Sequence, residues 1–122
     1  MNKDNQKPYE LGKSGESAAV NYLTGQNYLI VATGFRLFRG EIDIIAYDKQ
    51  TLVFVEVKTR RSSDFGSPEE SVTPAKQQQL RKIAQGFLTL NKIKDVECRF
   101  DVISLIKKGG NHYQIRHFKN AF

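Results

Sequence analysis

The stretch GEIDIIAYDKQTLVFVEVK, residues 40–58, decides the fold. It contains two runs rich in β-branched and aromatic residues, 41–48 and 52–58, and the short polar turn DKQT lies between them. Runs of this kind joined by a tight polar turn predict a β-hairpin. We therefore expect two antiparallel strands at the centre of the sheet.

A turn centred between Lys49 and Gln50 fixes which residues of this hairpin lie opposite each other. One face is then wholly apolar, and a shift by one residue would mix polar and apolar side chains on both faces, which is disfavoured. The apolar face consists of the pairs Ile42–Val57, Ile44–Val55 and Ala46–Val53. On the other face Asp43 lies opposite Glu56, with β-carbons about 5 Å apart, and Glu41 lies opposite Lys58.

Opposed carboxylates predict a metal site. Like charges at such positions repel, and the cost is larger where the groups are partly buried. A divalent cation offsets the repulsion, and Mg²⁺ prefers carboxylate, water and phosphate oxygens. Lys58 shares the strand face of Glu56 and would reach a metal-bound water or a phosphate, while Glu16, on a predicted helix, would add a third carboxylate. Taken alone, Glu16 and the Glu56–Lys58 pair fit better as solvated charges, and Asp43 could be a charge at the edge of a strand. Their combination favours the site.

The remaining chain supplies two helices and three further strands. Apolar and small residues at helical spacing predict a helix over 11–23. Thr73 followed by Pro74 predicts the start of a second helix that runs to about Asn91. Further strands are predicted at 28–31, 99–106 and 112–118, a tight turn at Gly40 and an exposed loop over 60–72.

This order of elements predicts an α/β fold, a mixed sheet of the α+β kind with helices packed on it. The third and fourth strands are joined through a helix, which predicts that they pair in parallel. Residues 1–9 are polar and predict a flexible leader, followed by one domain over residues 10–122.

Composition narrows the class of protein. Of 122 residues 39% are hydrophobic and 26% charged, which is typical of globular domains. We expect a cytoplasmic protein without a membrane partner, because no signal peptide or long apolar run is visible. Cys98 is the only cysteine, which excludes a disulfide framework. The net charge of +6 and pI of about 9.5 favour nucleic acid as a partner, although many small basic proteins bind none.

Several cations flank the predicted site: Arg36, Arg39, Arg60, Arg61 and Lys76. They would bind phosphates of a nucleic acid. Arg60 and Arg61 fit equally well as solvated loop charges. Lys76, in the first turn of the second helix, is expected to contact a phosphate or a carboxylate.

Two other polar groups fit a structural role. Arg99 and Asp101 alternate onto one strand face and predict an ion pair. His112 and His117 have no partner at ligand spacing and are interpreted as structural or surface residues.

The motifs GEIDII at 40–45 and FVEVK at 54–58 resemble the PD-(D/E)xK nuclease superfamily. The chain from residue 11 onward is similar to the YraN-type family of bacterial proteins and, more distantly, to archaeal-type Holliday-junction resolvases. The motifs GxxGE at 12–16, RFD at 99–101 and NAF at 120–122 also belong to this resemblance.

The resemblance implies a restriction-endonuclease-like αβββαβ core. It implies metal binding by Asp43 and Glu56, a lysine role for Lys58 and an auxiliary carboxylate role for Glu16. Ile42 stands where the superfamily name implies proline.

We therefore expect a Mg²⁺- or Mn²⁺-dependent endonuclease that hydrolyses phosphodiester bonds in DNA, with branched or repair and recombination structures as substrates. Asp43, Glu56, Glu16 and the Val57 carbonyl would bind the metal, and cleavage would leave a 3′-hydroxyl and a 5′-phosphate, as the resemblance implies. DNA is expected in preference to RNA, and symmetric cutting would require a homodimer. Two alternatives stay open: a non-cutting nucleic-acid-binding module of nuclease fold, and a protein-interaction adaptor.

Overall fold

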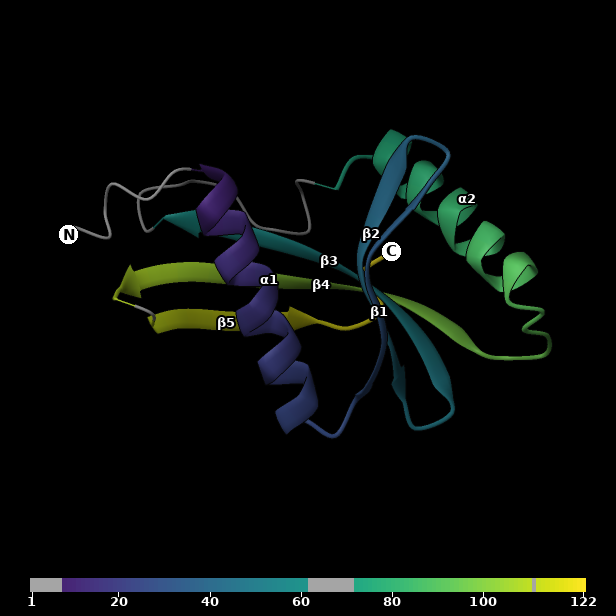
Figure 1. Cartoon of the computed structure of the whole chain (residues 1–122), viewed down its shortest axis with the longest axis horizontal. Coiled ribbons are helices and arrows are strands. Elements are labelled where there is room, and N and C mark those ends of the chain that lie inside the picture. The colour runs from purple at the N-terminus through teal and green to yellow at the C-terminus, as the bar shows by residue number, and fades with distance from the viewer. Residues whose placement is uncertain (1–7, 62–71, 111) are drawn as a thin grey trace.

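The computed structural model describes residues 8–61, 72–110 and 112–122, in which two helices pack on a five-stranded sheet (Figure 1). In chain order the elements are α1 (Pro8–Gly25), β1 (Leu29–Leu37), β2 (Gly40–Asp48), β3 (Thr51–Arg61), α2 (Pro74–Leu90), β4 (Cys98–Gly109) and β5 (His112–Phe118). In the part of the chain so described, neither helix combines the length and the apolarity that crossing a membrane requires.

The strands follow the order β1-β2-β3-β4-β5 across the sheet. β3 and β4 pair in parallel, with α2 as the connection between them, and the other neighbouring pairs are antiparallel. The central hairpin has the predicted register, in which Ile44 pairs with Val55 and Tyr47 with Leu52. These findings confirm the α/β class, the parallel crossover and the helix-and-strand order of a restriction-endonuclease-like core.

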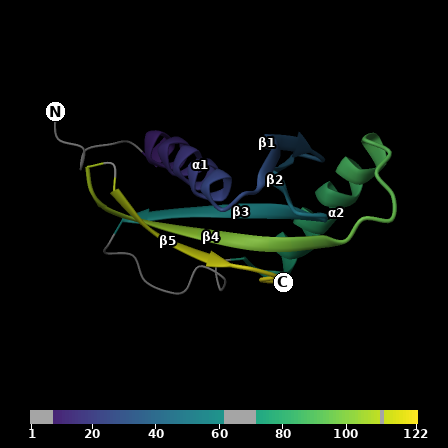
Figure 2. The same ribbon diagram turned by 90° about the horizontal axis from the view of Figure 1, so that it is seen from below.

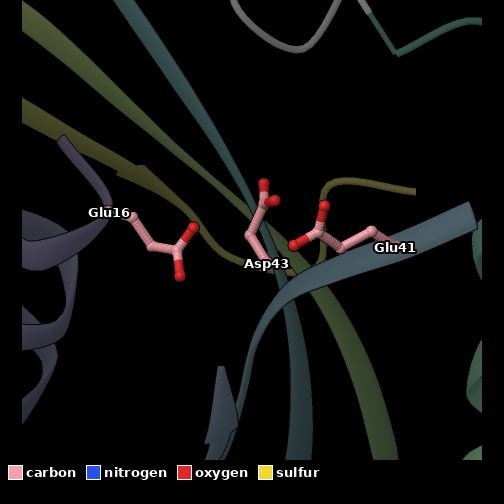
Figure 3. A group of neighbouring side chains, drawn as sticks. All are labelled: Glu16, Glu41 and Asp43. Carbon is pink, nitrogen blue, oxygen red and sulfur yellow. The ribbon is translucent and has the colours of Figure 1, made fainter. Parts of the chain in front are cut away.

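α1 lies close against the end of β3 because Gly15 has no side chain. A β-carbon at Gly15 would lie 2.1 Å from Oγ1 of Thr59, which no real packing allows. The close approach places the next residue, Glu16, beside β2, where Glu41 and Asp43 lie (Figure 3). The position of one glycine therefore helps to assemble side chains from α1 and β2.

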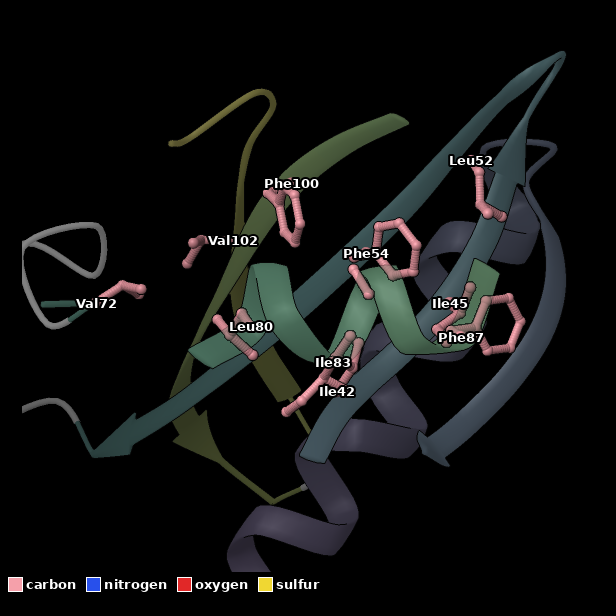
Figure 4. Packing of buried hydrophobic residues seen from close by; sticks show 11 residues of the cluster. Ile42, Ile45, Leu52, Phe54, Val72, Leu80, Ile83, Phe87, Phe100 and Val102 are labelled. Carbon is pink, nitrogen blue, oxygen red and sulfur yellow. The ribbon is translucent and has the colours of Figure 1, made fainter. Parts of the chain in front are cut away.

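α2 begins as the sequence predicts. The Thr73 hydroxyl accepts a hydrogen bond of 3.2 Å from the backbone N–H of Lys76, and Pro74 occupies the first turn. This is the N-cap arrangement that satisfies a free helical N–H. The buried residues of α2 pack against the sheet (Figure 4); they are Leu80, Ile83, Ala84 and Phe87. α1 and α2 lie toward different ends of the sheet (Figure 2).

The two faces of the sheet bury separate hydrophobic clusters. Ile44 and Val55 belong to the cluster beneath α1, whereas Ile45 and Phe54 belong to the cluster beneath α2. This is the alternation that the hairpin register predicts. The prediction was wrong for Ile42, which packs in the α2 cluster instead of sharing a face with Ile44 (Figure 4).

The reason is that the described β2–β3 ladder ends at the pair Ile44–Val55. The first residues of β2 pair only with β1 in the described ladders, through Phe35–Ile42 and Arg36–Glu41. Ile42 packs toward α2. Ile42 and Ile45, three residues apart, therefore pack in the same cluster, so the regular alternation of a strand is interrupted between them.

Gly40 also has a different role from the predicted one. The turn between β1 and β2 is made by Phe38 and Arg39, whose φ angles are 53° and 60°. A β-carbon on Gly40 would lie 2.7 Å from both Gln79 Nε2 and Ile83 Cδ1. Gly40 is therefore required by the close packing of β2 on α2, not by the turn.

Several elements are longer than predicted. Arg60 and Arg61 were predicted in a loop, but they continue β3, because they pair with Ile106 and Lys107 of β4. α1 begins at Pro8 instead of residue 11, and β1 extends to Leu37.

Candidate metal centre

Three carboxylates from two elements lie close together near the point where the β2–β3 pairing ends. Glu16 is carried by α1, and Glu41 and Asp43 by β2. One oxygen atom from each lies within 4.8 Å of the others, and all three residues are partly buried. Figure 3 shows the side chains of Glu16 and Glu41 on either side of Asp43. A set of carboxylate oxygens at this spacing is what Mg²⁺ or Mn²⁺ binds.

Asp43 is held in place by the backbone of the neighbouring strand. The N–H of Val57 donates a hydrogen bond of 2.7 Å to Oδ2 of Asp43. This bond lies just beyond the last ladder pair, Ile44–Val55, so a side-chain oxygen takes the place of a backbone acceptor. The sequence placed Asp43 opposite Glu56, and the structure brings these two carboxyl groups into contact.

Glu56 is the most buried carboxylate of the site, with 9% of its side chain exposed. Burial, together with the hydrogen bond to Asp43 and its charge, raises the pKa of Glu56 to about 8, although Lys58 and Lys76 act to lower it. Within the described residues its Oε2 atom has no hydrogen-bond partner. The Nζ atom of Lys76 lies 3.9 Å away, beyond hydrogen-bond distance.

The donor set fits a divalent cation. Asp43 belongs to the group with Glu16 and Glu41 and also contacts Glu56, which is not itself a member of that group. A buried oxygen without a partner costs about 1–3 kcal/mol. A cation bound by oxygen ligands would satisfy Oε2 of Glu56 and offset the repulsion among the carboxylates.

Two lysines approach this site from different elements. Lys58 lies two residues beyond Glu56 on β3, close enough for its charge to favour the ionised form of that carboxyl group. Lys76, from the first turn of α2, forms the 3.9 Å ion pair with Glu56. The carboxylate contact expected for Lys76 is thus present.

Of the predicted arginines, Arg36 contacts a carboxylate of the site. Nη2 of Arg36 is 3.9 Å from Oε2 of Glu41, and the arginine side chain is 82% exposed. Arg39 is in the β1–β2 turn, and Arg60 and Arg61 are at the end of β3. The structure connects Val57 to the site through its N–H, and a ligand role for its carbonyl stays a prediction.

Glu41 was not predicted as a site residue. The hairpin register placed it opposite Lys58, whereas the structure pairs it with Arg36 of β1 and turns its carboxylate toward Asp43. The sequence did contain a usable signal. Glu41 precedes Asp43 by two residues on one strand, and such residues project to the same side.

A second polar cluster lies elsewhere on the sheet and is structural. Nε of Arg99 donates to Asp101 over 2.9 Å, which confirms the predicted ion pair, and Nε2 of His117 donates to the same carboxylate over 2.7 Å. The Tyr22 hydroxyl lies 3.1 Å from Nδ1 of His117. Burial opposes ionisation of Asp101, but hydrogen bonds from His117, Arg99 and the N–H of Asn120 outweigh it and lower its pKa. These hydrogen bonds connect side chains of α1, β4 and β5.

Comparison with known proteins adds the family. The model of the Uncharacterised protein family UPF0102 matches residues 15–105. A UPF0102 protein of Prosthecochloris aestuarii is 42% identical over 120 residues, 94% of each chain. A UPF0102 protein of Geotalea uraniireducens is 47% identical over 112 residues, which cover 92% of this chain and 88% of that one. With a family match over most of its length and relatives of this similarity, the chain belongs to the UPF0102 family, the YraN-type family that the motifs resemble.

Proposed function

We propose that the protein is a metal-dependent endonuclease that hydrolyses phosphodiester bonds in DNA. One observation carries this proposal: Glu16, Glu41 and Asp43 place carboxylate oxygens within 4.8 Å of one another, and Asp43 also contacts the buried Glu56. Carboxylates in such a group are unfavourable without a cation, and Mg²⁺ bound in this way also accepts phosphate oxygens as ligands.

Glu16, Glu41, Asp43 and Glu56 would hold Mg²⁺ or Mn²⁺. When bound, the metal would supply Lewis-acid charge to a phosphoryl oxygen and lower the pKa of an attacking water. The Val57 N–H orients Asp43 for this role, because a ligand held by a backbone hydrogen bond keeps its position.

The lysines would complete the site from the protein side. Lys58 projects from the strand that carries Glu56 and would offset negative charge that develops on the phosphate. Lys76 lies at the N-terminal end of α2, where free N–H groups and the helix dipole also favour an anion. A phosphate near Glu56 would thus meet cations from two directions.

A second candidate is a nucleic-acid-binding module that does not cut. Its support is the net charge of +6, together with the exposed positions of Arg36 and Arg39 outside the carboxylate group. These cations would bind phosphates whether or not hydrolysis follows.

The test is cleavage of labelled single-stranded, duplex and forked DNA in Mg²⁺ or Mn²⁺, with Asp43→Asn and Glu56→Gln as variants. Both substitutions preserve side-chain size and remove a charge. A nuclease loses cleavage by at least two orders of magnitude in both variants and on addition of EDTA. Salt-sensitive binding without cleavage in either metal would support the binding module and contradict the nuclease. Cleavage that persists in both variants would show that the activity belongs to another site or to a contaminant.

A further inference from the structure

The tip of the β1–β2 hairpin has an unusual backbone. Leu37 pairs with Gly40, so Phe38 and Arg39 form a two-residue turn, and their φ angles are 53° and 60°. Two left-handed residues in succession define the type I′ turn, which strongly prefers asparagine, aspartate and glycine. A bulky aromatic residue in this conformation is an outlier. Strained backbone of this kind is enriched at active sites and ligand-binding sites.

The ring of Phe38 lies outside the core. The residue is 53% exposed and does not belong to either buried cluster, although its neighbour Leu37 does pack against one. α2 supports the ring from one side: a β-carbon on Gly86 would lie 2.3 Å from Cδ2 of Leu37 and 3.1 Å from Cε2 of Phe38. The absence of a side chain at Gly86 lets the hairpin tip rest on the helix.

One cation lies over this exposed ring, and two arginines are close to it in the sequence. Nζ of Lys82 lies 5.1 Å from the ring centroid of Phe38. Arg39 is the adjacent turn residue, and Arg36 extends a largely exposed side chain from β1. An exposed aromatic ring among cations is the pairing that single-stranded nucleic acid uses, with a base stacked on the ring and phosphates on the cations.

The tip is connected to the candidate metal centre by one strand. β2 leaves the turn at Gly40 and carries Glu41 and Asp43 in its first four residues. At about 3.3 Å per residue, Phe38 and Asp43 are separated by at most about 17 Å along the strand. With stacked bases about 3.4 Å apart, this distance corresponds to about five base steps.

We propose that Phe38 is a base-stacking wedge, which makes nucleic acid with unpaired bases, at a fork or a branch, the substrate class of the metal centre. The proposal rests on the proposed function for the nature of the reaction. The strained turn presents the ring, Lys82 and Arg39 hold the flanking phosphates, and β2 fixes the distance from the stacked base to the cleaved bond. Continuous duplex offers no free base face to the ring.

Phe38→Asn separates this role from stability. Asparagine adopts the left-handed conformation more readily than phenylalanine, so the variant is expected to melt at the same temperature as the parent or a higher one. Phe38→Tyr keeps a stacking ring. Leu29→Asn is the matched control, because Leu29 is also exposed (68%) and lies at the opposite end of β1 from the turn.

Binding is measured by fluorescence anisotropy in Mg²⁺, with Asp43→Asn as the background that suppresses cleavage, on a fork, a single strand and a blunt duplex. Phe38→Asn is expected to weaken binding of the fork and the single strand about ten-fold or more, the effect of losing one base stack. Duplex binding changes less than about two-fold, and Phe38→Tyr and Leu29→Asn behave as the parent.

Equal fork affinity in Phe38→Asn and the parent would overturn the wedge, as would an equal loss on fork and duplex. Phe38-dependent binding to vesicles of anionic phospholipid, without fork binding, would overturn it in favour of a membrane contact. Cleavage assays in the wild-type background separate the two proposals. Fork binding that depends on Phe38 without any cleavage would leave the wedge standing and contradict the nuclease, whereas cleavage that ignores Phe38 would do the opposite.

Discussion

The backbone N–H of Val57 donates a hydrogen bond of 2.7 Å to Oδ2 of Asp43, so a candidate metal ligand also closes the end of the β2–β3 ladder. Substitutions at Asp43 separate the two roles. Asp43→Asn keeps an acceptor oxygen and removes a charge beside Glu56, so its melting temperature in EDTA should equal or exceed that of the wild type. Asp43→Ala leaves the N–H of Val57 without this partner and should cost about 1–3 kcal/mol of unfolding free energy. Thermal unfolding in EDTA measures both.

When thermal unfolding is repeated with Mg²⁺ in place of EDTA, the melting temperature of the wild type should rise and those of both variants should stay unchanged. The reason is that a ligand stabilises only the fold that binds it. Equal destabilisation by Asn and Ala would show that charge, not the hydrogen bond, is what Asp43 contributes to stability.

Glu56 should make stability in EDTA depend on pH. Its pKa is raised from 4.5 to about 8, so between these values the folded protein binds more protons than the unfolded chain. The free energy of unfolding should therefore fall as pH rises through this window. Urea denaturation at a series of pH values measures the slope, and Glu56→Gln should reduce it.

Mg²⁺ should reverse that trend, since a metal binds the ionised carboxylate and its stabilising effect grows as protons leave. A wild-type slope equal to that of Glu56→Gln in EDTA would contradict the raised pKa.

Gly15→Ala should destabilise the protein and displace α1. The new β-carbon would lie 2.1 Å from Oγ1 of Thr59, and overpacking of this kind typically costs about 1–3 kcal/mol. Because Glu16 follows directly, affinity for Mg²⁺ should fall as well. Gly25→Ala is the matched control, since nothing lies within 4 Å of its β-carbon position. Chemical denaturation and metal titration report the two effects, and equal stability of the two variants would contradict the close contact.

Asp101→Asn should be the most destabilising polar substitution outside the metal centre. It leaves the partly buried Arg99 without its main counter-charge, and breaking a buried pair costs about 3–5 kcal/mol. The lowered pKa of Asp101 contributes stability above its ordinary value of 3.8, and this contribution is lost as pH falls through the folded-state pKa. Acid unfolding of the wild type should therefore be steeper below pH 3.8 than that of the variant. Parallel acid-unfolding curves would refute this assignment.

The fold could be predicted largely because local patterns determine it. The alternation over residues 41–58 permits one register that separates polar from apolar faces, and the structure has that register from Ile44 onward. The N-cap at Thr73 was also predictable, because its hydrogen bond joins residues only three positions apart. The predictions that were wrong depended on neighbours distant in sequence. Ile42 packs toward α2 where β3 no longer pairs with β2. Arg60 continues β3 because β4 lies beside it.

The candidate site also divides into residues that local patterns predicted and residues that depend on contacts distant in sequence. Asp43, Glu56 and Lys58 lie on one hairpin, so strand geometry alone placed them together. Glu16 required the resemblance and the helical pattern, and the contact between Gly15 and Thr59 that positions it is not visible in the sequence. Glu41 was assigned to the wrong partner, because β1 had been predicted too short to reach it.

The bond between Val57 and Asp43 also affects how sequences of relatives should be interpreted. Under the proposed function, a descendant without catalysis would still gain stability from an acceptor at position 43, so selection for folding alone would retain Asp or Asn there. Oε2 of Glu56 has no comparable bond among the described residues, and its burial costs free energy unless a cation offsets it. In relatives of this domain, replacement of Glu56 by a neutral or apolar residue should therefore precede replacement of Asp43. It is the better sequence indicator that the proposed metal centre has been lost.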